Sequence, residues 1–109
     1  MHLNFYQNEA GKYAIYKDIL YPFLALAEES GEFLGIMAKN LRGDYNDYTD
    51  AQAKEVHERF KKEAGDILWQ LSNALKELDL TLEDVAQANL DKLEDRKKRD
   101  VIQGNGDTR

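Results

Sequence analysis

The apolar residues of this chain recur at every third or fourth position along four stretches, and this spacing constrains the fold more than any other feature. The stretches cover residues 3–17, 20–41, 51–78 and 82–99. Apolar side chains three or four positions apart lie on one face of an α-helix, whereas a half-buried strand needs strict alternation. The clearest stripe consists of Phe60, Ala64, Ile67, Leu68, Leu71 and Leu75. The spacing therefore predicts an all-α chain of four helices.

Local residue choices mark the ends of these helices. Pro22 is best placed in the first turn of the second helix, where its missing N–H costs nothing. Thr49 and Asp50 are both candidates for the N-cap of the third helix, and Thr81 begins a capping-box sequence before the fourth. Gly11 lies inside the first stretch and weakens that helix by up to about 1 kcal/mol. The connections between the helices are predicted to be short.

The chain is short enough for one domain and long enough for a modest core. Its 109 residues are predicted to form a single domain, 1–109, that buries roughly two-thirds of the surface of the unfolded chain. Amphipathic helices with short connections predict a four-helix bundle. Residues 100–109 are rich in glycine and polar side chains, and this composition indicates a loop, either a flexible tail or a lid.

Charge and cysteine content exclude several classes of function. The chain has 15 Lys and Arg residues against 21 Asp and Glu, and the net charge of −6 argues against partners such as nucleic acid or an anionic membrane surface. It has no cysteine, so disulfides, thiolate zinc sites and a cysteine nucleophile are excluded. No apolar run approaches the ~20 residues that span a bilayer, and no signal-peptide pattern opens the chain.

Two pairs of acidic residues interrupt helix faces that otherwise look buried. Glu29 and Glu32 lie one turn apart in the second helix, and Glu63 and Asp66 repeat this spacing in the third. The residues that share these faces are Ala25, Leu26, Phe33, Ile36, Phe60, Ile67 and Gln70. An acid pair on a helix usually marks a solvated face. Neither pair, however, is followed three or four positions later by a Lys or Arg that would make an ordinary surface ion pair.

Glycines lie beside these acids inside the predicted helices. Gly31, Gly35 and Gly65 each cost about 0.5–1 kcal/mol relative to alanine. We expect such a cost where helix backbones, or a ligand, come close to the glycines.

Four carboxylates on facing helices repel one another and resist ionisation unless a cation neutralises them. A hard divalent cation is the natural counter-charge. Mg²⁺ is one such cation, which prefers oxygen ligands and keeps waters and phosphate oxygens in its shell. The other carboxylate-rich bundle, the di-iron type, needs Glu-x-x-His twice. Neither His2 nor His57 stands three residues after a Glu, so a di-iron site is not expected.

Taken together, the motifs give the chain a resemblance to a known family. The matching segments are residues 26–32 (LAEESGE), 63–71 (EAGDILWQL) and 89–96 (NLDKLEDR). In order and spacing they resemble the MazG-like all-α nucleoside triphosphate pyrophosphohydrolases, in particular the compact forms of phages and bacteria. The resemblance covers nearly the whole chain.

The resemblance implies a reaction and a metal site. Members of the family are hydrolases that convert an NTP or dNTP to the monophosphate and pyrophosphate with Mg²⁺, for which Mn²⁺ can substitute. By position, Glu29, Glu32, Glu63 and Asp66 would be the metal ligands and, with Lys92, the catalytic residues. Attack on phosphorus develops charge on phosphate oxygens, which metal ions and fixed cations stabilise. The resemblance does not say which carboxylate takes the proton of the attacking water.

The same resemblance assigns substrate-binding positions. Lys92 and Arg96 would meet phosphate oxygens, and Asn89 would face the sugar or a phosphate. Gln70 stands where many members carry an aromatic residue, so the recognition of base or sugar differs here. Arg109 belongs to the segment that is either a tail or a lid. The base that the chain prefers is left open.

Family members are homodimers or homotetramers (dimers of dimers) with sites near subunit interfaces, and the compact forms act in the cytoplasm of a bacterial cell or of a phage-infected host. An oligomer also fits the apolar surface of Leu3, Tyr6, Trp69 and Leu78, which one small bundle does not cover. The alternative function comes from a different class. It is a non-catalytic helical oligomer whose acids bind structural cations.

Overall fold

The computed structural model describes residues 1–43 and 49–99. In these two ranges the chain forms four α-helices and no strand: α1 (Leu3–Gly11), α2 (Tyr21–Leu41), α3 (Asp50–Glu77) and α4 (Leu82–Lys98). The all-α prediction is confirmed, and the bounds of α2, α3 and α4 lie within one residue of the predicted stretches. No helix of the described part is both long and apolar enough to cross a bilayer.

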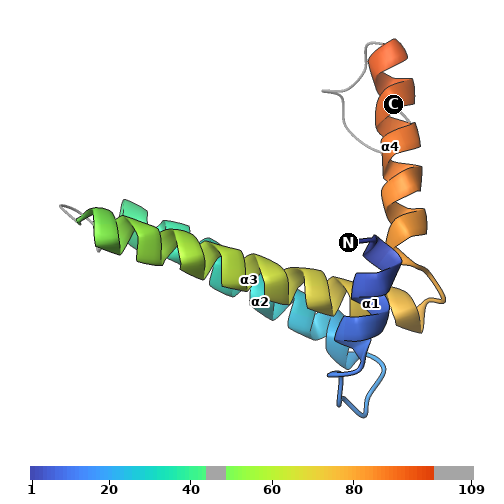
Figure 1. Cartoon of the computed structure of the whole chain (residues 1–109), viewed down its shortest axis with the longest axis horizontal. Helices are drawn as coiled ribbons and strands as arrows, with labels where there is room; N and C mark the ends of the chain where they lie inside the picture. The colour runs from blue at the N-terminus through green and yellow to red at the C-terminus, as the bar shows by residue number, and fades with distance from the viewer. Residues whose placement is uncertain (44–48, 100–109) are drawn as a thin grey trace.

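The two longest helices, α2 and α3, pack antiparallel along their length (Figure 1). Phe33 of α2 meets Phe60 of α3 edge to face, with ring centroids 5.3 Å apart. Ala25 and Ile36 are buried on the α2 side, and a run of buried residues on α3 extends from Ser72 to Leu75. α1 crosses the C-terminal half of α3. The core therefore lies between α2 and α3 and is thickest where α1 covers it.

The first helix is shorter than the sequence predicts. α1 ends at Gly11, whereas the apolar spacing continued to residue 17. Tight turn bonds close the helix, with the N–H of Tyr13 donating to Ala10 and that of Ala14 to Gly11. Residues 14–20 then lead into α2, and Ile15, an apolar residue of the predicted stretch 3–17, is 90% exposed. Apolar spacing past Gly11 therefore does not extend the helix.

One buried side chain, Gln7 of α1, joins three segments of the chain. Its Nε2 donates to the carbonyl of Ser72 in α3 at 3.0 Å and to the carbonyl of Leu80 at 3.2 Å. Its Oε1 accepts from the N–H of Leu82, the first residue of α4, at 3.0 Å. Gln7 thus links backbone groups at the junction of α3 and α4. Among them, the Leu82 N–H lies in the first turn of α4, where a helix supplies no internal partner.

The ends of α3 are defined by side-chain and backbone caps. At its start, Thr49 and Gln52 form a complete capping box, with bonds of 3.2 and 2.7 Å. At its end, Asp79 adopts a φ of 56°, and the N–H of Leu80 returns to the carbonyl of Leu75 at 2.9 Å. This left-handed turn ends α3 abruptly. Thr81 then caps α4 by accepting from an N–H of its first turn, as its sequence predicts.

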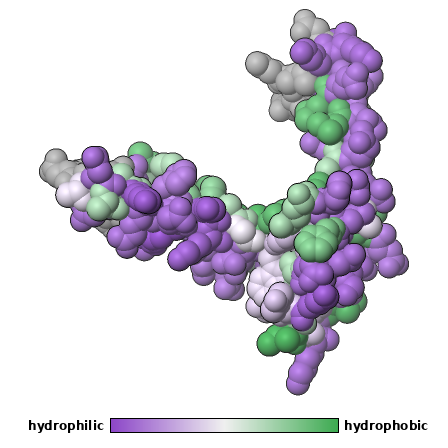
Figure 2. Space-filling model, viewed as in Figure 1, coloured by the Kyte–Doolittle hydropathy of each residue, from purple (hydrophilic) through white to green (hydrophobic). Residues whose placement is uncertain are grey.

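The structure differs from the predicted bundle in the placement of α4. This helix packs against α1 and projects away from the α2–α3 pair (Figure 1). Leu90 and Leu93, two apolar residues of the predicted fourth stretch, are 61% and 38% exposed. Hydrophobic atoms lie at the surface of α4 and at the bend where it leaves the other helices (Figure 2). The turn at Asp79 fixes this direction, so a single chain does not close a four-helix bundle.

Replacing Gln7 with leucine tests the junction. The variant Gln7→Leu leaves the Leu82 N–H and the Ser72 carbonyl without this partner, so we expect it to lower the free energy of unfolding by about 2–4 kcal/mol. Urea unfolding followed by circular dichroism measures the loss. Asn4→Ala is the control, because Asn4 accepts from the exposed N–H of Glu83 and its loss should cost less than about 1 kcal/mol. Equal losses in the two variants would contradict the role of Gln7.

Candidate functional site

Three of the four predicted carboxylates meet between α2 and α3. One oxygen each from Glu29, Glu32 and Glu63 lies within 4.8 Å of the others. Glu32 is exposed, whereas Glu29 and Glu63 are half-buried. The Oε2 atoms of Glu29 and Glu63 are shielded from solvent and have no hydrogen-bond partner among the described residues. Shielded anionic oxygens without a donor are the arrangement that a bound cation would satisfy.

Burial and mutual repulsion disturb the ionisation of this cluster. Burial raises the pKa of Glu29 above its ordinary value of 4.5, and the negative charges of Asp66, Glu32 and Glu63 raise it further. Burial also raises the pKa of Glu63, together with a hydrogen bond to Glu32 and the charges of Glu32 and Asp66, while Arg59 lowers it. Asp66 therefore acts on both residues electrostatically, although it lies outside the close group of three. The negative electrostatic potential of these carboxylates therefore favours a cation.

The glycines beside the acids do not mark a close approach of helices. A Cβ added to Gly31, Gly35 or Gly65 would find open space to 4 Å. The expectation that a helix backbone lies against these glycines is therefore wrong for the single chain. The alternative, that they leave room for a ligand, stays a prediction.

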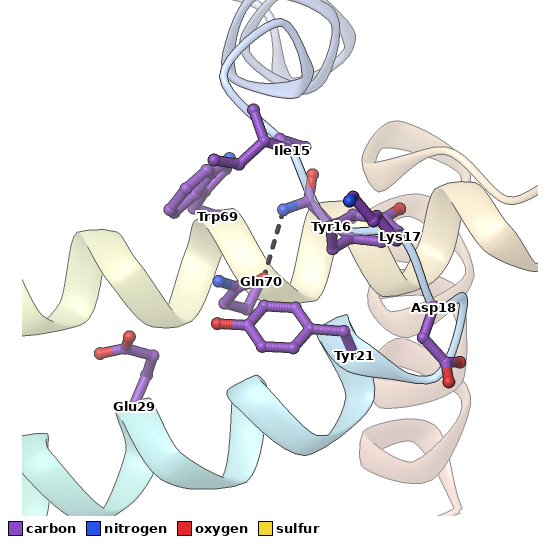
Figure 3. Close-up of a pocket in the computed structure, with 10 residues that line it drawn as sticks. Ile15, Tyr16, Lys17, Asp18, Tyr21, Glu29, Trp69 and Gln70 are labelled. Carbon is purple, nitrogen blue, oxygen red and sulfur yellow. Dashed lines mark hydrogen bonds between the residues drawn. The ribbon is translucent and has the colours of Figure 1, made fainter.

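A cavity of about 410 Å³ adjoins the acid cluster, and we call it the aromatic cavity. It is lined by residues 14–18, by Tyr21 and Glu29 of α2, and by residues of α3 (Figure 3). Gln70, a predicted substrate-binding residue, lies in its wall and accepts a hydrogen bond of 3.3 Å from Asn73. Glu29 belongs both to this wall and to the acid cluster, so the two features meet at this residue.

The residues of the aromatic cavity that sequence reasoning missed come from the connection between α1 and α2. Tyr16 stacks on Tyr21 with ring centroids 6.1 Å apart, and both line the cavity. The periodicity had placed Tyr16 in or next to a helix. Gly11 and Pro22 were the available signals, because both residue types are common at helix ends and they flank this segment.

Trp69 separates the aromatic cavity from a second cavity on the α1 side of α3. Its indole N–H donates to the carbonyl of Ala10 at 3.0 Å, which fixes the ring. The second cavity has a volume of about 440 Å³, and Tyr6, Asp66 and Trp69 are among its lining residues. Burial and the charge of Asp66 raise the pKa of the Tyr6 hydroxyl. Trp69 is therefore part of the wall of both cavities.

The predicted phosphate-binding residues of α4 lie elsewhere in the chain. Asn89 and Lys92 line a third hollow of about 540 Å³ on α4, and Arg96 is buried. Neither cavity that borders the acids includes a residue of α4. Arg109 lies outside the described residues. A single chain thus brings Gln70 to the acid cluster but does not bring Asn89 and Lys92 there.

Comparison with known proteins supplies the remaining evidence. Residues 21–101 match the family model of the MazG nucleotide pyrophosphohydrolase domain. The chain is 35% identical over 118 residues to the Gene 37 protein of Mycobacterium phage L5, and the match covers 100% of both chains. No solved structure matches. The matched range contains α2, α3, α4 and all four predicted acids.

The acid cluster predicts a pH dependence of stability in the absence of divalent cations. The folded-state pKa values of Glu29 and Glu63 lie above the ordinary 4.5. At a pH above these values, the carboxylates are ionised and their mutual repulsion fully destabilises the fold. As the pH falls through these values, the folded state takes up protons first and this penalty disappears. We expect Glu63→Gln to be more stable than the wild type at neutral pH, and the difference to shrink as the pH falls toward 4.5.

Urea unfolding in EDTA at a series of pH values measures this difference. The general loss of stability in acid affects both proteins, so the difference between them isolates the cluster. A variant that is less stable at neutral pH, or a difference that grows on acidification, would contradict the assignment.

Proposed function

Because this chain belongs to the MazG nucleotide pyrophosphohydrolase family, we propose that it is a Mg²⁺-dependent enzyme that hydrolyses an NTP or dNTP to the monophosphate and pyrophosphate. The observation that carries the proposal is the group formed by Glu29, Glu32 and Glu63, whose oxygens converge beside the aromatic cavity. This arrangement offers a cation site next to a space of the size that ligand pockets have.

The donor set suits a hard divalent cation. All the candidate ligands are carboxylate oxygens, and the described part of the chain contributes neither cysteine nor histidine to the group. Such oxygens suit Mg²⁺, and Mn²⁺ can take the same ligands. We propose Glu29, Glu32, Glu63 and Asp66 as the ligands. Bound Mg²⁺ would neutralise phosphate charge and lower the pKa of a coordinated water.

The aromatic cavity is the proposed site for the nucleoside. Tyr16, Tyr21 and Trp69 provide apolar ring surface, while Gln70 and Asn73 provide amide groups for hydrogen bonds. Because Glu29 forms the boundary of this cavity, a nucleoside bound there would direct its phosphates toward the acids. The aromatic cavity would then position the phosphate, and the acid cluster would position the attacking water.

A carboxylate of the first pair is the proposed proton acceptor. Glu29 or Glu32 would take the proton of the attacking water. The charge that develops on the phosphates needs fixed cations as well. We assign this role to Lys92 and Arg96, with Asn89 as an added hydrogen-bond donor and Arg109 on the terminal segment.

A second copy of the chain would bring these residues to the acids. α4 projects from its own chain with Leu90 and Leu93 exposed, and it carries Asn89 and Lys92 away from the aromatic cavity. We propose a homodimer, or a homotetramer built from two dimers, in which α4 of one copy covers the acid cluster of the other. By the likeness to a phage protein, we place the enzyme in the cytoplasm of a bacterial cell or a phage-infected host.

Removal of single acids tests the reaction. With each common ribo- and deoxyribonucleoside triphosphate and Mg²⁺, we expect pyrophosphate release that EDTA abolishes. Glu32→Ala and Asp66→Ala should lower kcat by about 100-fold or more, the scale for loss of a group that stabilises developing charge. The control Glu58→Ala removes an exposed acid of α3 and should keep wild-type activity.

Two other outcomes would redirect the proposal. Wild-type activity in both acid variants would show that the ligand assignment is wrong. Turnover of no nucleotide at all would favour the alternative, a non-catalytic helical oligomer whose acids hold structural cations.

Mixing two inactive variants tests the shared site. If Lys92 acts on the acid cluster of the second copy, mixed dimers of Asp66→Ala and Lys92→Ala contain one intact site. After the two proteins are unfolded and refolded together, we expect activity to return to about a quarter of the wild-type value. Each variant refolded alone is the control. No recovery, although light scattering shows a dimer, would place Lys92 and the acids of one chain in the same site.

A further inference from the structure

Residues 14–18 supply half of the lining of the aromatic cavity, yet they have little backbone support. At one end of this segment the N–H of Ala14 donates to Gly11, and at the other Asp18 accepts from the N–H groups of Leu20 and Tyr21. Between them, residues 15–17 have no backbone hydrogen bond to another described residue. A segment of this kind keeps its shape only if a side chain holds it.

The side chain of Tyr16 fixes this segment to the helices. Its hydroxyl donates to Oε1 of Glu77, the last residue of α3, at 2.5 Å, across a sequence separation of 61 residues. The ring of Tyr16 stacks on Tyr21 at an interplanar angle of 24°. Burial and the contact with Glu77 raise the pKa of Tyr16 to about 12, so the hydroxyl stays protonated at neutral pH. A short bond from a hydroxyl to a carboxylate is among the stronger hydrogen bonds of proteins.

Glu77 itself is fixed independently of any ligand. It ends α3 just before the left-handed turn at Asp79, where backbone bonds from Leu78 and Leu80 return to Leu75. It does not line the aromatic cavity, and it is absent from the acid cluster. Its contact with Tyr16 therefore has no part in holding a metal ion.

We propose that Glu77 is a positioning residue that, through Tyr16, holds residues 14–18 against α3 and thereby sets the affinity of the aromatic cavity for the nucleoside part of the substrate. The inference rests on the proposed function for the identity of the ligand. It predicts an effect on binding and none on the chemical step, because neither Tyr16 nor Glu77 reaches the acid cluster.

Hydrogen exchange on the ligand-free protein tests the structural step. In Tyr16→Phe and Glu77→Ala, we expect the hydrogen-bonded amides at the two ends of the segment, those of Ala14, Leu20 and Tyr21, to exchange several-fold faster than in the wild type. The buried amides of residues 72–75 should keep their rates. Glu77→Gln retains an oxygen acceptor and should restore slow exchange. Glu55→Ala, which removes an exposed acid from the other end of α3, is the matched control. Unchanged exchange in Tyr16→Phe would overturn the proposal.

Steady-state kinetics with the best nucleotide of the panel test the functional step. Tyr16→Phe and Glu77→Ala should each raise KM about 2- to 10-fold, the range for one lost hydrogen bond, with kcat unchanged. The double variant should be no worse than either single variant, because both remove the same bond. Glu77→Gln should recover the wild-type KM. A fall in kcat at constant KM would overturn the positioning role while leaving the proposed reaction intact.

A binding measurement separates failure of this inference from failure of the proposed function. Trp69 is the single tryptophan of the chain and lines the aromatic cavity, so its fluorescence reports occupancy without catalysis. If the wild type turns over no nucleotide but binds deoxynucleoside monophosphates, and Tyr16→Phe weakens that binding, the positioning role stands and the reaction is wrong. If the wild type neither turns over nor binds nucleotides, both are overturned.

Discussion

Three carboxylates converge between α2 and α3, and other interactions in the fold must offset their mutual repulsion. Glu29, Glu32 and Glu63 meet where an antiparallel helix pair would otherwise bury apolar side chains. The arrangement raises two pKa values and leaves shielded oxygens without donors, and both effects oppose folding of the ion-free chain. Caps at the helix ends and the buried amide of Gln7 contribute in the opposite direction. A local loss of folding stability that interactions elsewhere offset is typical of functional sites.

In the proposed function, the aromatic cavity and the acid cluster would recognise different parts of a nucleotide. The aromatic cavity presents rings and amides that suit an uncharged nucleoside, while the acid cluster needs a cation before it can accept phosphates. Glu29 belongs to both, so the boundary between them is one side chain. The net charge of −6 therefore does not argue against an anionic substrate if the acid cluster holds the proposed metal ion. The fixed positive charges stand on α4, which the single chain holds apart from the acids.

Features that depend on neighbouring residues could be predicted from the sequence, and features that depend on distant ones could not. The stripe from Phe60 to Leu75 defined α3, and the i, i+3 spacing of the acids placed Glu29, Glu32 and Glu63 on facing sides. The end of α1 was missed because apolar spacing continues past Gly11. α4 follows the left-handed turn at Asp79, and the sequence offers no glycine there that would mark a residue with positive φ. The cavity wall depends on a bond between residues 61 positions apart, which no local pattern contains.

The junction made by Gln7 has a consequence for the order in which the chain acquires its shape during synthesis. α2 and α3 can pair soon after they leave the ribosome, because their contacts close a local hairpin. α1 is made first, but the partner groups of Gln7 lie 65–75 residues later. At roughly 5–20 residues per second, the N-terminal helix waits roughly 4–15 s for them. α1 is thus translated first but is among the last elements to reach its final position. Until then, the nascent chain exposes the surface of α3 on which α1 will dock.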